Sequence, residues 1–168
     1  MKKIFALALA ALMTAGMTTV AFADDFVCFV QDSGTGYVYV DDNDDGKFLS
    51  TETTAGYTAS ANSVNLSIPG GKKVAIPLIM SNGVAVTEKD QVKSYKVKTS
   101  WSVGDLDDKA SIELVKIDNS YVYAVTFTIP EAAVTKDSDL AGEVTVYKSS
   151  ADLRDESLAD NITLKFGA

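Results

Sequence analysis

Residues 110–129 read ASIELVKIDNSYVYAVTFTI and contain two alternating runs, 110–117 and 121–129, separated by Asp118-Asn119-Ser120. Both runs are rich in valine, isoleucine, threonine, tyrosine and phenylalanine, the residues that suit the pleated, half-buried surface of a β-strand. A few turn-forming residues between two such runs are a hairpin signal. The stretch therefore predicts two neighbouring antiparallel strands joined by a tight turn.

The same period-two pattern continues outward in both directions, and turn signals such as PGG and SNG separate the runs. Helical periodicity is confined to short charged stretches at 87–91 and 151–157. About 8–9 short strands at this spacing predict an all-β fold, an antiparallel β-sandwich of immunoglobulin-like type. The further predicted strands are 26–31, 36–40, 63–68, 72–80, 92–101, 142–149 and 161–166.

Residues 1–23 have the three parts of a secretory signal peptide and precede the strand pattern. Lys2 and Lys3 form the positive end, an apolar helical run follows, and Ala21-Phe22-Ala23 supplies the small-x-small cleavage pattern. Threonines and a glycine interrupt the run before it reaches the length of a membrane span. The signal resembles those of Gram-positive anaerobes. We expect a secreted, extracellular protein, either free or associated with the cell surface, with no membrane segment after cleavage.

Removal of residues 1–23 leaves 145 residues and moves the formal charge from −8 to −10, because two lysines and no acids are lost. This length suits a single domain over 24–168, with residues 24–60 as a possible N-terminal hairpin and acidic loop packed on the remainder. A chain this acidic should repel phosphate backbones and anionic membranes. Nucleic-acid binding is therefore not expected.

Cysteine and histidine usage narrows the chemistry further. Cys28 is the only cysteine, so no intramolecular disulfide forms, and its place in the apolar run FVCFV predicts a buried thiol. The chain has no histidine, which excludes Ser-His-Asp and Cys-His nucleophilic machinery and the usual histidine zinc site. Carboxylate-pair chemistry survives this exclusion, but no catalytic motif is present, and we expect no enzyme.

The most specific chemical signal is DDNDDGKFLSTE at 41–52, which fits the pattern Asp-x-Asn-x-Asp-Gly, five residues and Glu. Hard oxygen ligands at these spacings suit Ca²⁺, which accepts six to eight of them. Gly46 would allow the sharp reversal, and water would fill the vertex beside Leu49. The predicted ligands are Asp41, Asn43, Asp45, the backbone carbonyl of Lys47, and Glu52. The alternative interpretation is a polar turn between strands with no bound ion.

The flanks of this loop read as strand rather than helix, since GYVYV precedes it and TTAGYTAS follows. Residues 36–56 resemble the calcium loops in the B-type repeats of serine-aspartate surface adhesins, where a strand enters an acidic loop that ends in glutamate. This resemblance implies the same ligand roles for the residues named above, in a secreted Gram-positive surface protein with an immunoglobulin-like β-sandwich. It implies a structural calcium ion and no sensing by helix opening.

Two weaker constellations remain open. Trp101 and the tyrosines at 37, 39, 95, 121 and 123 could form an aromatic platform for sugar, although aromatic residues at strand spacing are more often core. Lys73, Glu113 and Asn161 could form an intramolecular isopeptide bond if the fold brought them together.

From these observations we expect a calcium-stabilised structural or adhesion protein of the bacterial surface or extracellular matrix. Its partners would be other surface or matrix proteins, extracellular glycan, or further copies of itself. The alternative function is a carbohydrate-binding module that uses the aromatic residues.

Overall fold

The computed structural model of the 168-residue chain describes residues 26–67, 71–102, 110–129, 139–148 and 160–167. The predicted signal peptide at 1–23 and the possible helix at 151–157 lie outside these residues. The prediction of an all-β chain is confirmed, because strands dominate the described residues. The four-residue α1 (Lys89–Val92) begins with a capping box between Glu88 and Gln91. No helix in the described part of the chain has the length and apolarity needed to cross a membrane.

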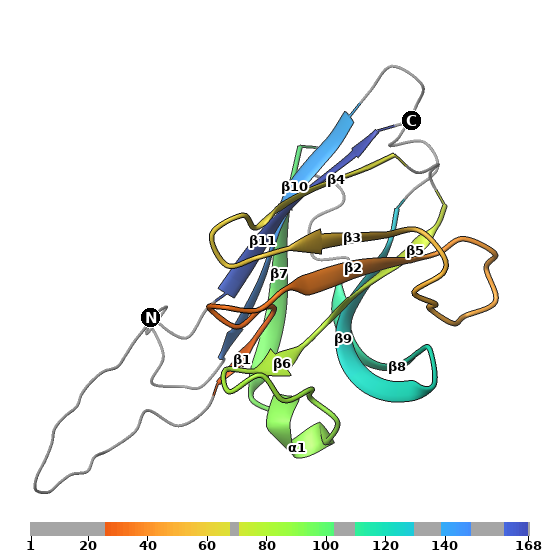
Figure 1. Ribbon diagram of the computed structural model, residues 1–168. Coiled ribbons are helices and arrows are strands. Elements are labelled where there is room, and N and C mark those ends of the chain that lie inside the picture. The colour runs from red at the N-terminus through yellow and green to blue at the C-terminus, as the bar shows by residue number, and fades with distance from the viewer. Residues whose placement is uncertain (1–25, 68–70, 103–109, 130–138, 149–159, 168) are drawn as a thin grey trace, which may run out of the picture.

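The strands form two larger sheets and one short ribbon (Figure 1). The five-stranded sheet has the order β3-β2-β5-β9-β8. Its strands are β2 (Gly36–Asp41), β3 (Thr54–Tyr57), β5 (Lys73–Pro77), β8 (Ser111–Ile117) and β9 (Ser120–Thr128). The four-stranded sheet, in the order β4-β11-β10-β7, contains β4 (Ser63–Ser67), β7 (Tyr95–Trp101), β10 (Asp139–Lys148) and β11 (Asp160–Gly167). The ribbon pairs β1 (Val27–Cys28) with β6 (Ile79–Met80).

The main core lies between the two larger sheets. Alternate residues of each strand point to opposite faces of a sheet, so one face of each strand can be apolar. Val38, Val74 and Val125 of the five-stranded sheet share a buried cluster with Val144 and Leu164 of the four-stranded sheet. This arrangement of two packed sheets is sandwich-like.

The β8–β9 hairpin confirms the prediction made from residues 110–129. The two strands pair antiparallel down to Ile117 opposite Ser120, which leaves Asp118 and Asn119 as the turn. Asp118 has a φ of 52°, a left-handed conformation that aspartate tolerates better than most residues. The local turn chemistry therefore directs the chain reversal.

Sheet pairing differs from the prediction in one respect, because β4 and β11 run parallel while all other strand pairs in the two larger sheets are antiparallel. Thr163 lies beside Ser63 in this pair, so 100 positions separate the partners. Parallel neighbours need a long crossover connection, and here most of the chain supplies it. The four-stranded sheet is consequently mixed.

The predicted strand 72–80 is divided in the structure. Pro77 ends β5, since proline has no N–H for a ladder, and Leu78 then donates to the carbonyl of Tyr123 at 2.9 Å. Residues beyond that point turn to pair with β1. The strand β3 was not predicted, because its sequence TAGY is short and contains a glycine.

Asp160, at the start of β11, ties the N-terminal segment to the four-stranded sheet. Its Oδ2 accepts a hydrogen bond from the amide of Phe29 at 2.8 Å, and its Oδ1 accepts one from the amide of Asn161 at 3.0 Å. Burial raises the pKa of Asp160 above its ordinary value of 3.8. The neighbouring Cys28 is buried as predicted, and burial followed by the charge of Asp160 raises the pKa of its thiol to about 12. The thiol is therefore protonated at neutral pH and chemically inert.

The raised pKa of Asp160 predicts a fall in stability as pH increases. Well below pH 3.8, the ordinary pKa of aspartate, the carboxyl is protonated in both the folded and the unfolded chain, so it makes no pH-dependent contribution. As pH rises from there through the folded-state pKa, the unfolded chain releases its proton first, and the free energy of unfolding decreases. Urea denaturation from pH 3 to 7, in chelator, measures this slope.

The Asp160→Asn variant is the matched control for that slope. Asparagine does not ionise, so the difference in stability between variant and native protein should change with pH over the same range. A constant offset is also expected, because the amide NH2 that replaces one carboxylate oxygen cannot accept the backbone hydrogen bond made there. A difference that stays flat with pH would contradict the assignment of the raised pKa to Asp160.

Candidate metal centre

The acidic loop 41–52 connects β2 to β3 at one end of the five-stranded sheet (Figure 1). Asp41 is the last residue of β2 and is only 3% exposed, so the first predicted ligand lies on a rigid strand. Gly46 has a φ of 80°, the left-handed conformation that the predicted sharp reversal requires. Asp44 also has a positive φ, of 59°. The loop thus reverses direction at the expected residue.

Side-chain oxygens of the predicted ligands turn inward onto the backbone of the loop. Oδ1 of Asp41 and Oδ1 of Asn43 both accept from the amide of Asp45, at 3.1 and 3.2 Å. Oδ2 of Asp41 accepts from the amide of Gly46 at 2.9 Å, and Oδ1 of Asp45 accepts from the amide of Lys47 at 2.9 Å. Because Asp41 and Asn43 share one donor, their side chains are drawn to the same side of the loop.

Glu52 closes the loop from its far end. Its Oε1 accepts from the amide of Asp42 at 3.0 Å, so the last predicted ligand contacts the residue that follows the first. Its Oε2 is buried and has no hydrogen-bond partner among the residues that the structure describes. A buried carboxylate oxygen without a donor is costly, and a cation is one group that would satisfy it.

The carboxylates do not by themselves enclose an ion. Among the residues described by the structure, no group of three or more acidic, histidine or cysteine side chains is arranged to hold a metal. The loop oxygens instead accept backbone amides, which offset their mutual repulsion. Each carboxylate oxygen has two lone pairs, so an oxygen that accepts one N–H still has a pair for a cation.

Residues outside the predicted ligand set hold the loop in place. The buried Phe48 bridges the edge of β8, where its amide donates to the carbonyl of Lys116 at 3.1 Å and its carbonyl accepts from the amide of Asp118 at 2.8 Å. Ser50 donates its amide to Oδ1 of Asp118 at 2.9 Å. Sequence reasoning did not identify these contacts, because β8 lies about 60 residues away.

Two further acids of the loop have structural partners. Asp42 accepts the amide of Thr53 through Oδ2 at 2.7 Å. Asp44 forms an ion pair with Lys72, 2.9 Å between Oδ2 and Nζ, and this hydrogen bond raises the pKa of the Lys72 ammonium. The alternation of Asp42 and Asp44 with Asp41, Asn43 and Asp45 was the available signal, because residues between successive ligands face away from a shared ion.

The aromatic residues do not form one platform. Trp101 is only 9% exposed and packs against Phe127, with 5.3 Å between ring centroids. Tyr37 and Tyr121 are exposed. They lie on opposite faces of the five-stranded sheet, because residues two positions apart on a strand share a face. Tyr37 shares its face with Tyr39, which packs on the second apolar cluster, on the outer face of the sheet. Tyr121 shares its face with Tyr123, which packs on the main core.

The three residues considered for an isopeptide bond are divided between the two sheets. Nζ of Lys73 lies 3.2 Å from Oε1 of Glu113 in the five-stranded sheet. Thr126 donates to the other oxygen of Glu113 at 2.7 Å, and this bond is the largest cause of the lowered pKa of that carboxyl. Asn161 lies on β11 in the other sheet, where its Oδ1 accepts from Asn62. The Lys73–Glu113 contact is therefore an ion pair in the five-stranded sheet, apart from Asn161.

Comparison of the chain with protein-family models, with curated proteins and with solved structures found no match.

Proposed function

We propose that this chain is a secreted, calcium-stabilised β-sandwich protein of immunoglobulin-like type, which acts as a structural or adhesive component of a bacterial surface or extracellular matrix. The observation that supports the calcium site best is the buried, unpartnered Oε2 of Glu52. It lies at the closing position of a loop in which the side chains of Asp41, Asn43 and Asp45 accept backbone amides of the same loop. The sandwich-like fold and the absence of histidine agree with a role that needs no catalytic group.

In this proposal Ca²⁺ takes the side-chain oxygens of Asp41, Asn43, Asp45 and Glu52 together with the carbonyl oxygen of Lys47. The ion joins the end of β2 to the start of β3 and stabilises the edge of the sheet. A lone extracellular loop of this kind should bind with a Kd of about 10⁻⁴ to 10⁻³ M. At about 1 mM Ca²⁺ and a Kd of ~0.1 mM, binding adds roughly 1.4 kcal/mol to stability.

We therefore predict that Ca²⁺ raises the melting temperature by about 3–6 °C relative to chelator, whereas Mg²⁺ does so much less, because its small octahedral shell does not suit this loop. Asp45→Ala and Glu52→Gln should each remove most of the Ca²⁺ shift. Thermal unfolding followed by circular dichroism in 1 mM Ca²⁺, 1 mM Mg²⁺ or chelator measures this effect.

Asp44→Asn is the matched control for these variants. It removes one negative charge from the same loop at a position that forms an ion pair with Lys72 and is not a proposed ligand, and asparagine tolerates the positive φ there. This variant should keep the Ca²⁺ shift. If it loses the shift as completely as Asp45→Ala, the loop attracts cations only through its charge. If the native protein shows no shift specific to Ca²⁺, the loop is a polar turn.

A further inference from the structure

The two larger sheets end on the same side of the molecule, at β7 and β8. Each of these strands is the last in its sheet. Within the described chain β7 has no second strand neighbour, and the second edge of β8 has only the Phe48 bridge at Ile117. Between them lies an open cavity of about 420 Å³, closed at one end by α1. We refer to this cavity as the edge groove. Its lining residues are Lys89, Val92, Lys93, Tyr95, Lys96, Val97, Ala110, Ser111, Ile112 and Tyr123.

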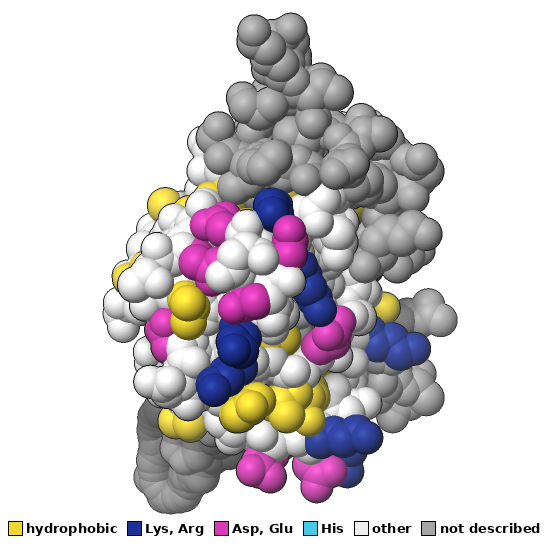
Figure 2. Space-filling view, turned by 90° about the vertical axis from the view of Figure 1, so that its right-hand side faces the viewer, with side chains coloured by type: hydrophobic (Ala, Val, Ile, Leu, Met, Phe, Trp, Pro, Cys, Tyr) yellow, Lys and Arg dark blue, Asp and Glu magenta, His cyan; other side chains and the backbone are white. Residues whose placement is uncertain are grey.

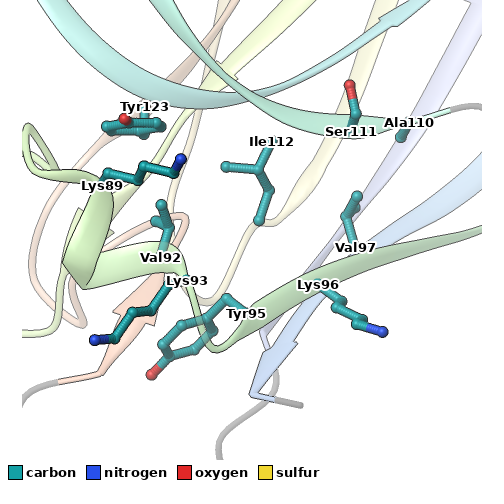
Figure 3. A pocket seen from close by; sticks show the side chains of 10 residues that line it. All are labelled: Lys89, Val92, Lys93, Tyr95, Lys96, Val97, Ala110, Ser111, Ile112 and Tyr123. Atoms are coloured by element: carbon teal, nitrogen blue, oxygen red, sulfur yellow. The ribbon is translucent and has the colours of Figure 1, made fainter.

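The floor of the edge groove is apolar. Ile112 points from β8 toward Val97 of β7 and Val92 of α1, as Figure 3 shows. Leu114 has the same orientation on β8 as Ile112 and is 50% exposed. These inward-facing side chains of β8 are only partly covered, because the four-stranded sheet is one strand narrower than the sheet that it faces.

The rim of the edge groove is basic. Among the described residues that line the cavity, three are lysines and none is acidic, in a chain with a formal charge of −8. Lys96 is exposed on β7, and Lys98 follows two positions later on the same outward face. Lys93 has one weak partner, Asp90, at 3.8 Å. Figure 2 shows exposed hydrophobic side chains next to lysine or arginine side chains on the side of the molecule that faces the viewer.

Within the described chain, the outer edge of β7 has no further strand beside Val97. Ser102 donates its amide to the carbonyl of Ala141, at 2.7 Å, across the β7–β10 ladder. In an antiparallel pair, successive residues direct their N–H and C=O groups to opposite sides. Residues at even positions of β7 therefore bond to β10, and the N–H and C=O of Val97 face the open edge.

We propose that the edge groove binds an extended acidic segment of a partner protein, which adds to β7 as a fifth strand of the four-stranded sheet. Alternate apolar residues of the segment enter the groove and cover Ile112 and Leu114. The residues between them are acidic and face Lys96 and Lys98 on the outer side. Main-chain hydrogen bonds to Val97 supply affinity, and the alternation of side chains supplies specificity.

The charge pattern selects this occupant over other strands. Lysines on an edge strand oppose pairing with a basic strand or with a second copy of the same edge, and a neutral strand offers them no opposite charge. An alternating acidic strand satisfies them as cross-strand pairs. This inference rests on the proposed function, because it assumes that the protein interacts with a partner protein. The edge groove itself contains none of the proposed calcium ligands.

The test uses the purified protein in chelator and a capped nine-residue peptide of alternating aspartate and valine. Two control peptides have the same composition in scrambled order, or lysine in place of aspartate. We expect the alternating acidic peptide alone to bind in calorimetry, more weakly at high salt, and to protect the Val97 amide from hydrogen exchange. Equal binding of the scrambled peptide, no binding, or protection confined to another edge would overturn the proposal.

Charge reversal at the rim provides the matched pair of variants. Lys96→Glu should weaken peptide binding roughly tenfold, because it replaces an attractive cross-strand pair by a repulsive one. Lys72→Glu makes the same charge change away from the edge groove, at a residue that pairs with Asp44 and is not a proposed calcium ligand, and it should leave peptide binding unchanged. If both variants lose peptide affinity equally, the peptide binds only through the net charge of the protein. That result would overturn the edge groove as the binding site.

Two further experiments test the main-chain contact and the alternative that the groove binds a small ligand. Val97→Pro removes the amide that faces the open edge and should abolish peptide binding. Because the variant is informative only if it folds, circular dichroism accompanies it, and the exchange experiment on the native protein tests the same contact. Binding of dodecanoate in the groove, without binding of the peptide, would overturn the proposal in favour of an anionic amphiphile.

Discussion

Replacement of Phe48 by alanine is expected to lower the free energy of unfolding by about 3–5 kcal/mol, the usual cost of removing a buried phenylalanine side chain. Phe48 belongs to the acidic loop, yet its side chain is only 1% exposed. It packs on the outer face of the five-stranded sheet against Ala75, Val115 and Ile117. A melting-temperature decrease on the order of 10 °C should accompany the loss.

The same substitution tests how the loop is positioned. Phe48 bridges β8 through its own main chain, and Ser50 contacts the β8–β9 turn next to that bridge. Loss of the ring should let the loop move relative to the hairpin, so calcium affinity should fall as well. Calorimetric titration with Ca²⁺ measures this second effect, provided that the variant remains folded at the temperature used.

Leu49→Ala is the control, because Leu49 is the next residue and is only partly buried. Its truncation should cost clearly less than that of Phe48. Similar losses in the two variants would show that Phe48 contributes no more than any apolar residue of the loop, and would contradict its role as the anchor.

Replacement of Gly142 by alanine is expected to cost about 3 kcal/mol, although it adds a single methyl group. Gly142 lies opposite Trp101 in the β7–β10 pair, and the indole ring covers it. A Cβ at this position would meet Cε3 of Trp101 at 2.0 Å, far inside any real contact. The ring would have to leave its place against Phe127, and the core between the sheets would open there.

Gly56→Ala is the matched control, because this glycine also lies in a strand and an added Cβ would meet its nearest neighbour, Cε1 of Tyr37, at 3.4 Å. That substitution should be nearly neutral or slightly stabilising, by up to about 1 kcal/mol. Urea denaturation of both variants gives the comparison. If Gly142→Ala lowers the free energy of unfolding no more than Gly56→Ala does, the ring of Trp101 is not held tightly against Gly142.

A double-mutant cycle distinguishes steric displacement from a backbone effect. Trp101→Leu removes the ring that the new methyl group would strike, so the cost of Gly142→Ala should be smaller in that background. The expected coupling between the two sites is about 1–3 kcal/mol. Strict additivity would assign the cost of the alanine to the backbone of β10.

Several elements could be predicted from local sequence. The alternation of residues 121–129 predicted β9 to within one residue at each end, and Asp118-Asn119 predicted the turn before it. Burial of Cys28 followed from the apolar residues on both sides of it. These features depend on side-chain period and turn chemistry, which act over a few residues.

Other elements could not be predicted in this way. The strand β3 has a weak strand sequence and forms because β2 offers it a partner. The buried residues Phe29 and Val30 continue the apolar run of β1 without continuing its ladder, since the tie to Asp160 holds this segment instead. In both cases a contact with a distant segment overrides local propensity.

The candidate metal centre was likewise predictable from the sequence only in part. The spacing of Asp41, Asn43, Asp45 and Glu52 within twelve residues made a ligand hypothesis possible from sequence alone. Phe48 fixes the loop on β8. This contact could not be predicted from the spacing of residues in the loop, because it depends on which strand lies beside the loop in the fold. The unpartnered oxygen of Glu52 likewise emerged only from the packed structure.

The sequence by itself determined the strand class of this protein, its hairpin turn and the oxygen-rich loop, because period-two alternation, turn chemistry and ligand spacing are local properties of the chain. Only the tertiary structure decided that β4 lies parallel to β11, that Phe48 closes the outer face of one sheet, and that β7 and β8 leave an apolar groove between them. Strand order and open edges depend on which distant segments bury each other's apolar faces, and that competition involves the whole chain.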